Sequence, residues 1–214
     1  MSTELELVSW RRSVSELYAA VRAEGDPRAA HELWRRGRDE LFRTHPQSPL
    51  PPGDPLRTTG LPYWPYDAAL RWELPLLPAE REESRSVPSS DGTIPLVLVG
   101  SVRLPAPADA VIDVWWLHQY GGGLFLPLRD GTAGTSSYGG GRYALDTAKG
   151  ADLGGGVDLG GRAGGGDLGG RAGSLVVDLN FLYHPSCRYN HAWQCPLAPA
   201  GNTISAPVTA GERI

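Results

Sequence analysis

The segment from Ile94 to Arg129, IPLVLVGSVRLPAPADAVIDVWWLHQYGGGLFLPLR, decides the fold of this chain. It contains three runs rich in β-branched, leucine and aromatic residues, at Ile94–Leu104, Val111–Tyr120 and Leu124–Arg129. The connectors between them consist of proline, alanine, aspartate or glycine and are too short to hold a crossover helix. Consecutive strands joined in this way pair antiparallel, so the segment predicts an antiparallel sheet.

The same pattern continues on both sides of this segment. Further strands are predicted at Leu70–Leu77, Arg142–Asp146, Leu175–Tyr183 and Thr203–Thr209, again bounded by turn residues. No helix-length crossover separates these runs. We therefore expect an α+β fold, with a curled antiparallel sheet or partial β-barrel and the helices to one side.

Two amphipathic helices are predicted before the strands. The first, Thr3–Glu24, carries apolar residues at alternating spacings of three and four, and Thr3 and Glu6 have capping-box spacing. The second is predicted from Pro27 to about Arg43, because Asp26 and the following proline resemble an N-cap and a first helical residue. The chain therefore begins with a helical hairpin.

The sequence divides into three regions. A helical hairpin over residues 1–45 is followed by a proline-rich connector at 46–65, which we expect to be extended on the surface, and by a β-rich domain at 66–214. Within that domain, residues 150–174 are rich in glycine and contain Asp-Leu-Gly-Gly-Arg-Ala-Gly twice. A calcium-binding β-roll needs more turns than one repeat pair supplies, so we interpret this segment as a mobile loop between two paired strands.

Composition excludes several classes of protein. The 214 residues carry 24 acidic and 20 basic side chains, a formal net charge of −4, which argues against nucleic acid and anionic membranes as partners. Charged residues such as Glu4 and Arg11 interrupt the N-terminus, and no apolar run approaches the roughly 18 residues of a membrane span. We therefore expect a cytoplasmic protein that binds neither nucleic acid nor membrane.

Two histidines and the two cysteines of the chain lie close together near the C-terminus. His184, Cys187, His191 and Cys195 have the spacing H-x2-C-x3-H-x3-C, and these side chains are the ligands that tetrahedral zinc prefers. A disulfide between the cysteines is a second interpretation, and two buried thiols without a metal are a third. We favour the unliganded thiols and no cofactor, with zinc as the alternative.

Polar side chains gather in two segments, one on each side of the glycine-rich repeats. In the second segment, Asp178 and Asn180 share one face of the predicted strand, because alternate side chains point to opposite sides of a sheet. Arginines in the first segment would supply charge, and the aspartates and asparagine would orient a small polar or anionic ligand. The candidate ligand-binding residues are Arg129, Asp130, Thr132, Tyr138, Arg142, Asp178 and Asn180.

Three stretches of the sequence resemble a known bacterial family. They are TGLPYWPYD at Thr59–Asp67, the run from Trp116 to Gly154, which contains LPLRDGTAGTSSYGGGRYALD, and VVDLNFLYHPSCRYNHAWQCPLAPAGNTISAPVTAGER at Val176–Arg213. In this order they resemble domain of unknown function 1684, over roughly residues 34–213. The resemblance implies a β-rich fold in which the two polar segments form one unit, and it carries no established activity.

Three functions from different classes fit these observations. The leading hypothesis is a binding domain for a small polar or anionic ligand. The second is a hydrolase-like enzyme that uses an acid–base pair drawn from Asp130, Asp178, His118 and His184. The third is an interaction protein that dimerises through its N-terminal helices, so we expect a monomer or a homodimer.

Overall fold

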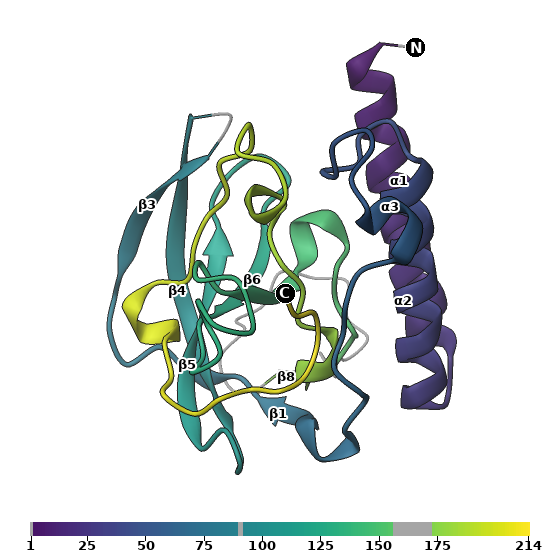
Figure 1. The fold of residues 1–214 in the computed structure, drawn as a ribbon. Coiled ribbons are helices and arrows are strands. Elements are labelled where there is room, and N and C mark those ends of the chain that lie inside the picture. Colours follow the sequence, from purple (N-terminus) through teal and green to yellow (C-terminus); the bar gives the residue numbers. More distant parts are fainter. Residues whose placement is uncertain (1, 90–91, 156–172) are drawn as a thin grey trace.

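The structure, a computed structural model, describes residues 2–89, 92–155 and 173–214. It places two long helices beside a β-rich body (Figure 1), which confirms the α+β class expected from the sequence. The two Asp-Leu-Gly-Gly-Arg-Ala-Gly repeats lie outside the described residues, apart from Gly173, the last residue of the second repeat. No helix in the described ranges is long and apolar enough to cross a membrane.

The N-terminal helices form the predicted hairpin. Helix α1 spans Thr3–Ala23 and helix α2 spans Pro27–Thr44. Asp26 caps α2, because its Oδ1 accepts from the Ala29 N–H at 2.8 Å. The capping box predicted for α1 is wrong: Ser2 is the N-cap, without a side-chain hydrogen bond, and Thr3 already belongs to the helix.

The apolar faces of the helices pack onto their own chain. Trp34 of α2 is completely buried and donates through Nε1 to the Tyr18 hydroxyl of α1 at 3.0 Å. The same core contains Leu50 and Phe181, so it joins the hairpin to the rest of the protein. Trp10, Val14 and Leu17 of the apolar stripe on α1 also pack against this core. Dimerisation through these helices remains a prediction.

The connector is less exposed than expected. It contains a short helix, α3 at Leu56–Thr59, and it buries Leu50, Leu61 and Tyr63. These three side chains pack against the hairpin, so the connector contributes to the core. Its many prolines had indicated an extended segment on the surface.

Eight strands and five short 3-10 helices make up the rest of the described structure. The strands are β1 Arg71–Pro75, β2 Leu77–Pro78, β3 Ser84–Ser89, β4 Gly92–Leu104, β5 Ala110–Leu117, β6 Gly123–Leu128, β7 Arg142–Asp146 and β8 Ser174–Asp178. The 3-10 helices are η1 Ala68–Leu70, η2 Thr147–Lys149, η3 Leu179–Phe181, η4 Ser186–Arg188 and η5 Ala200–Asn202.

The strands form two antiparallel sheets that are not closed into a barrel. In the larger sheet the order is β2-β4-β5-β6-β7, and β3 pairs with β4 on the same edge as β2. Strands β1 and β8 form the smaller sheet, with Arg71 opposite Asp178. The largest core lies between the two sheets and includes Val102, Ile112 and Val177, all completely buried.

Three details of the predicted strand pattern are wrong. β3 was not expected, whereas residues 203–209 form no strand: Thr203 forms an isolated bridge, and separate hydrogen bonds hold Ile204, Ala206 and Val208. The strands that flank the glycine-rich segment do not pair as a hairpin, because β7 pairs with β6 and β8 pairs with β1. Local residue preferences cannot specify such distant pairings.

A histidine is buried in the aromatic core between the hairpin and the β-rich body. His31 is 1% exposed, and its ring lies 5.6 Å from Trp34, 5.3 Å from Tyr66 and 5.3 Å from Phe181 between centroids. Burial, together with the nearby Arg35, lowers the pKa of His31 to about 4. The folded protein therefore holds this imidazole neutral.

Protonation of His31 should destabilise the protein in mild acid. The unfolded chain takes up this proton near pH 6.5 and the folded chain only near 4, so stability falls as pH drops between these values. We expect the free energy of unfolding to fall by about 2 kcal/mol between pH 7.5 and 5 from this group. Urea titrations of wild type and His31→Gln measure the difference in slope.

His118→Gln is the matched control, because His118 is exposed. The control should keep the wild-type pH dependence. Equal pH dependence in wild type and His31→Gln would contradict the assignment of a buried neutral imidazole.

Candidate functional site

Arg142, the first residue of β7, is the centre of a buried polar network. Its side chain is completely buried, and Nη2 donates to Asp130 Oδ2 at 2.8 Å. The same guanidinium donates to the carbonyl oxygens of Val208 at 2.9 Å, of Glu212 at 3.0 Å, and of Ala210. Arg142 therefore fixes the C-terminal segment against the sheet.

The second oxygen of Asp130 is also fully used. Oδ1 accepts from the N–H groups of Thr132 at 2.9 Å and Val208 at 3.0 Å, and from the Thr132 hydroxyl at 2.7 Å. Burial alone would raise the pKa of Asp130, but the Arg142 guanidinium outweighs it and holds the pKa below the usual range. Ligand binding by Asp130, Thr132 and Arg142 stays a prediction, whereas their contacts give them a structural role.

Asp178 and Asn180 form a separate network. Asp178 ends β8 and Asn180 lies in η3, so the prediction that they share a strand face is wrong. Asp178 Oδ1 accepts from the Asn180 N–H at 2.9 Å and from its side-chain amide at 2.7 Å, while Oδ2 accepts from the Tyr66 hydroxyl at 3.2 Å. Asn180 also pairs with the backbone of Asp67 at 2.8 Å in both directions. This network fastens the end of β8 to the segment before β1, and ligand binding by the pair remains a prediction.

His184 takes part in a third buried network. Its Nε2 accepts from the Tyr138 N–H at 3.1 Å, so the ring proton lies on Nδ1, which is 3.5 Å from Glu212 Oε1. Glu212 Oε2 accepts from the His184 N–H at 2.9 Å and from Arg38 Nη2 at 2.8 Å. Burial alone would raise the pKa of Glu212, but Arg38 and His184 outweigh it and lower the pKa.

These contacts bear on the acid–base hypothesis. His184 faces Glu212, a residue that the sequence analysis did not select, rather than Asp130 or Asp178. Because Nε2 already accepts a backbone N–H, His184 offers no free nitrogen for proton abstraction. His118 lies exposed beyond the end of β5. The acid–base role of the four candidates stays a prediction that these contacts do not favour.

Two of the predicted ligand-binding residues lie nearer the surface. Arg129 donates through Nε to the Gly139 carbonyl at 2.9 Å. The Tyr138 hydroxyl lies 3.8 Å from Cys187 Sγ, within hydrogen-bond distance for sulfur. Tyr138 therefore belongs with the cysteines.

The cysteine region contains both cysteines of the chain. Cys187 and Cys195 are free cysteines, and each is partly exposed. In the described part of the chain, no group of three or more histidine, cysteine, aspartate or glutamate side chains could hold a metal ion. His191 is exposed, and His184 is engaged by Tyr138. The described residues therefore do not form the four-ligand zinc site, which was the alternative to unliganded thiols.

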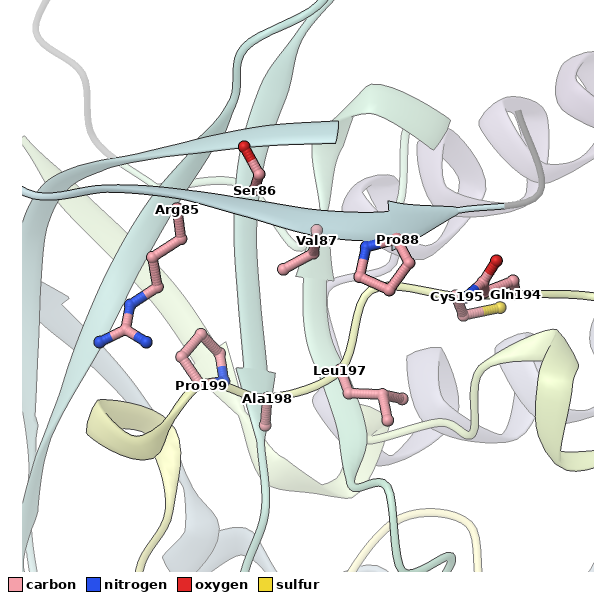
Figure 2. Close-up of a pocket in the computed structure, with 9 residues that line it drawn as sticks. All are labelled: Arg85, Ser86, Val87, Pro88, Gln194, Cys195, Leu197, Ala198 and Pro199. Atoms are coloured by element: carbon pink, nitrogen blue, oxygen red, sulfur yellow. The ribbon is translucent and has the colours of Figure 1, made fainter. Parts of the chain in front are cut away.

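A groove of about 510 Å³ lies beside Cys195, between β3 and the extended segment 194–199 (Figure 2). Figure 2 shows Arg85 and Val87 projecting from β3 toward this segment, whereas Ser86 points away from it. Nine residues line the groove: Arg85, Ser86, Val87, Pro88, Gln194, Cys195, Leu197, Ala198 and Pro199.

The groove has an apolar centre and two different ends. Val87 and Leu197 provide apolar walls near its middle, and Cys195 lies at one end (Figure 2). Arg85 lies at the other end, where its Nε donates to Glu83 and its guanidinium carbon is 5.9 Å from the centre of the Trp115 ring. The sequence does not reveal this site, because Ser-Arg-Ser-Val-Pro-Ser is a weak strand pattern that contains proline.

Comparisons with known proteins agree with the fold and leave the function open. The sequence profile of the family described as Protein of unknown function (DUF1684) matches residues 57–213. An uncharacterised protein of Haloarcula marismortui, solved by NMR in solution, is 29% identical with a TM-score of 0.56, over 84% of this chain and 90% of the other. None of the curated proteins matches the chain.

Removing the charge of Asp130 should destabilise the fold strongly. Asp130→Asn leaves the Arg142 guanidinium buried without its counter-charge, and such a loss costs about 3–5 kcal/mol. Because the pKa of Asp130 is depressed, its contribution is complete above the unfolded value near 3.9 and is lost as pH falls through the folded value. Urea unfolding at pH 7 measures the main effect.

Glu40→Gln provides the control. Glu40 forms a 2.6 Å ion pair with Arg43 on α2, but both side chains are more than half exposed. This substitution should cost less than about 1 kcal/mol. Similar losses in the two variants would show that burial does not set the strength of the Asp130–Arg142 pair.

Proposed function

The chain belongs to the DUF1684 family of proteins of unknown function, and we propose that it is a binding domain for a small molecule with an apolar body and one acidic group. The carrying observation is the groove between β3 and residues 194–199. Its volume of about 510 Å³ falls in the range of small-molecule sites, about 300–1,000 Å³. This proposal keeps the expected class of function but moves the site away from the buried polar networks.

The lining of the groove favours an amphipathic ligand. Val87, Leu197 and Pro199 offer apolar contact area, which drives binding through the removal of apolar surface from water. Arg85 supplies a guanidinium, a group that pairs well with carboxylate or sulfonate oxygens. An apolar molecule with a single acidic end matches both features.

A small molecule suits the groove better than a peptide strand. The Leu98 N–H donates to the Glu83 carbonyl at 2.9 Å, and the register continues with Arg85 opposite Leu96. Because backbone groups alternate in direction, those of Ser84, Ser86 and Pro88 face away from β4. Pro88 has no N–H to donate, and proline on an edge strand opposes the addition of another strand.

We propose that the protein works in the cytoplasm. Cys187 and Cys195 are free cysteines, and a reducing compartment keeps thiols reduced. The proposed binding role needs no metal ion.

Two fluorescent probes test the groove. 1-Anilinonaphthalene-8-sulfonate has an aromatic body and one sulfonate, and N-phenyl-1-naphthylamine is its neutral analogue. Leu197→Trp should fill the groove and lower the binding affinity of both probes at least about tenfold, a loss of about 1.4 kcal/mol or more in binding free energy. Arg85→Gln should weaken the sulfonate up to about fivefold, since exposed ion pairs contribute up to about 1 kcal/mol, and leave the neutral probe unchanged.

Val111→Trp is the matched control for Leu197→Trp. Val111 and Leu197 are both 43% exposed, but Val111 does not line the groove. Amide chemical shifts should change on probe binding at 85–88 and 194–199. Equal weakening by Val111→Trp, or shift changes confined to other residues, would overturn the proposal.

A further inference from the structure

A hydrogen bond joins His184 to the turn that leads into β7. The Tyr138 N–H donates to His184 Nε2 at 3.1 Å, so this nitrogen carries no proton. His184 is 3% exposed, and little water can therefore replace Nε2 as the acceptor. It follows that Nε2 takes up a proton only by giving up its bond to Tyr138.

The other side of the imidazole favours a positive charge. His184 Nδ1 lies 3.5 Å from Glu212 Oε1, a buried oxygen without a hydrogen-bond partner in the described part of the chain. A charged imidazole is a stronger partner for a carboxylate than a neutral one. A proton on His184 is thus attracted by Glu212 and opposed by the Tyr138 N–H.

Other titratable and charged groups surround this ring. Arg38 of α2 donates to Glu212 Oε2 at 2.8 Å, and its charge opposes a second positive charge nearby. Arg142 of β7 donates to the Glu212 carbonyl at 3.0 Å. The Tyr138 and Tyr189 rings both lie 6.3 Å from the imidazole between centroids, and the Tyr138 hydroxyl is 3.8 Å from Cys187 Sγ. Attraction by Glu212 is therefore weighed against Arg38 and the Tyr138 N–H.

The turn at residues 138–141 is fixed by side chains on both flanks. Before it, Ser137 Oγ lies 2.8 Å from Thr132 Oγ1, and after it Arg142 is held by Asp130. Residues 139–141 between these anchors are all glycine, which adopts backbone conformations that other residues rarely do. Loss of the bond at Tyr138 therefore leaves the turn room to shift while both flanks stay in place.

Gly140 brings this turn into contact with a wall of the groove. A methyl group added at Gly140 would lie 2.5 Å from Tyr138 Cε1 and 3.0 Å from Leu197 Cδ2. The Tyr138 ring and the Leu197 side chain thus pack against the same backbone position. Because Leu197 lines the groove (Figure 2), a shift of Tyr138 reaches the groove by direct contact.

We propose that His184 is a pH switch for the groove: a proton on Nε2 breaks the hydrogen bond from Tyr138, shifts the turn at 138–141 and displaces Leu197, which weakens ligand binding in mild acid. The protonated ring donates from both nitrogens, so Nε2–H and the Tyr138 N–H then face each other without an acceptor. Nδ1–H meanwhile keeps Glu212 as its partner. The effect on binding rests on the groove as the binding site, whereas the response of Tyr138 to His184 does not.

NMR chemical shifts of the unliganded full chain, followed from pH 8 to 5, test the switch without a ligand. Histidine is the side chain whose charge ordinarily changes in this range. The amide shifts of Tyr138 and Leu197 should follow protonation of the His184 ring with one common midpoint. His184→Gln should abolish this response, because glutamine offers an acceptor oxygen near the position of Nε2 and does not titrate. His191→Gln is the matched control, because His191 is exposed, and it should retain the response.

Probe affinity tests the effect on the groove. N-phenyl-1-naphthylamine stays neutral in this range, and its affinity for wild type should fall about fivefold between pH 7.5 and 5.5. Its affinity for His184→Gln should stay constant. His31 is present in both proteins, so the difference between them isolates His184. Linkage is reciprocal, and bound probe should therefore lower the pH midpoint of the Tyr138 shift in wild type.

The outcomes separate the switch from the binding function. A His184 ring that stays neutral down to pH 5, or a Tyr138 amide that ignores its protonation, would overturn the proposal. Constant probe affinity in wild type while Tyr138 responds would overturn the link to the groove. If neither probe binds at any pH, the proposed binding function fails, and the shared midpoint of Tyr138 and Leu197 still decides the switch. These wild-type measurements remain decisive if His184→Gln fails to fold.

Discussion

The buried pair of Asp130 and Arg142 is the constraint on which the rest of the β-rich body depends. A guanidinium and a carboxylate without access to water are costly unless every polar group finds a partner. Here the two Nη atoms of Arg142 donate to Asp130 and to three carbonyls of the C-terminal segment, at Val208, Ala210 and Glu212, whereas Nε has no hydrogen-bond partner in the described part of the chain. Burying this charge therefore obliges the chain between residues 208 and 212 to lie across the end of β7.

That position of the C-terminal segment also organises the hairpin. Glu212 Oε2 forms an ion pair with Arg38 of α2 and also accepts a hydrogen bond from the His184 N–H. Arg38 is stacked near the rings of Trp34 and Tyr183, 5.1 and 5.0 Å from their centres. One residue near the C-terminus thus links the N-terminal helices to the cysteine region, which explains how two distant parts of the chain cooperate in one fold.

Local chemistry in the sequence predicted the elements better than it predicted their partners. Asp26 and the following proline gave the start of α2 correctly, because capping depends on residues within one turn. The pairing of β1 with β8 joins residues about a hundred positions apart, and no short-range signal specifies it. The same limit applies to the site: Glu212 is 28 residues from His184 in the chain, so sequence spacing could not select it as the partner.

The sequence did not predict strand β3, for a different reason. Its alternation of apolar and polar residues is weak, since three of its six residues are serine and a proline lies near its end, so its strand character comes from pairing with β4. The polar residues that were selected as a ligand site form separate networks around Asp130 and Asp178. What the sequence could not show is that this chemistry is directed inward, where each carboxylate is satisfied by the protein itself.

The groove follows from the way in which the larger sheet fails to close. Segment 194–199 runs beside β3, but prolines at 196 and 199 cannot donate to a strand ladder, and Pro88 cannot donate from the opposite side. The segment is fastened instead by a side-chain bond from the Tyr143 hydroxyl to the Pro196 carbonyl. Because no ladder of backbone hydrogen bonds joins segment 194–199 to β3, the space between them remains open as the groove. Cys195 lies at one end of the groove and directly precedes Pro196. The same prolines that keep the groove open therefore bring Cys195 to the edge of the groove, where it is partly exposed.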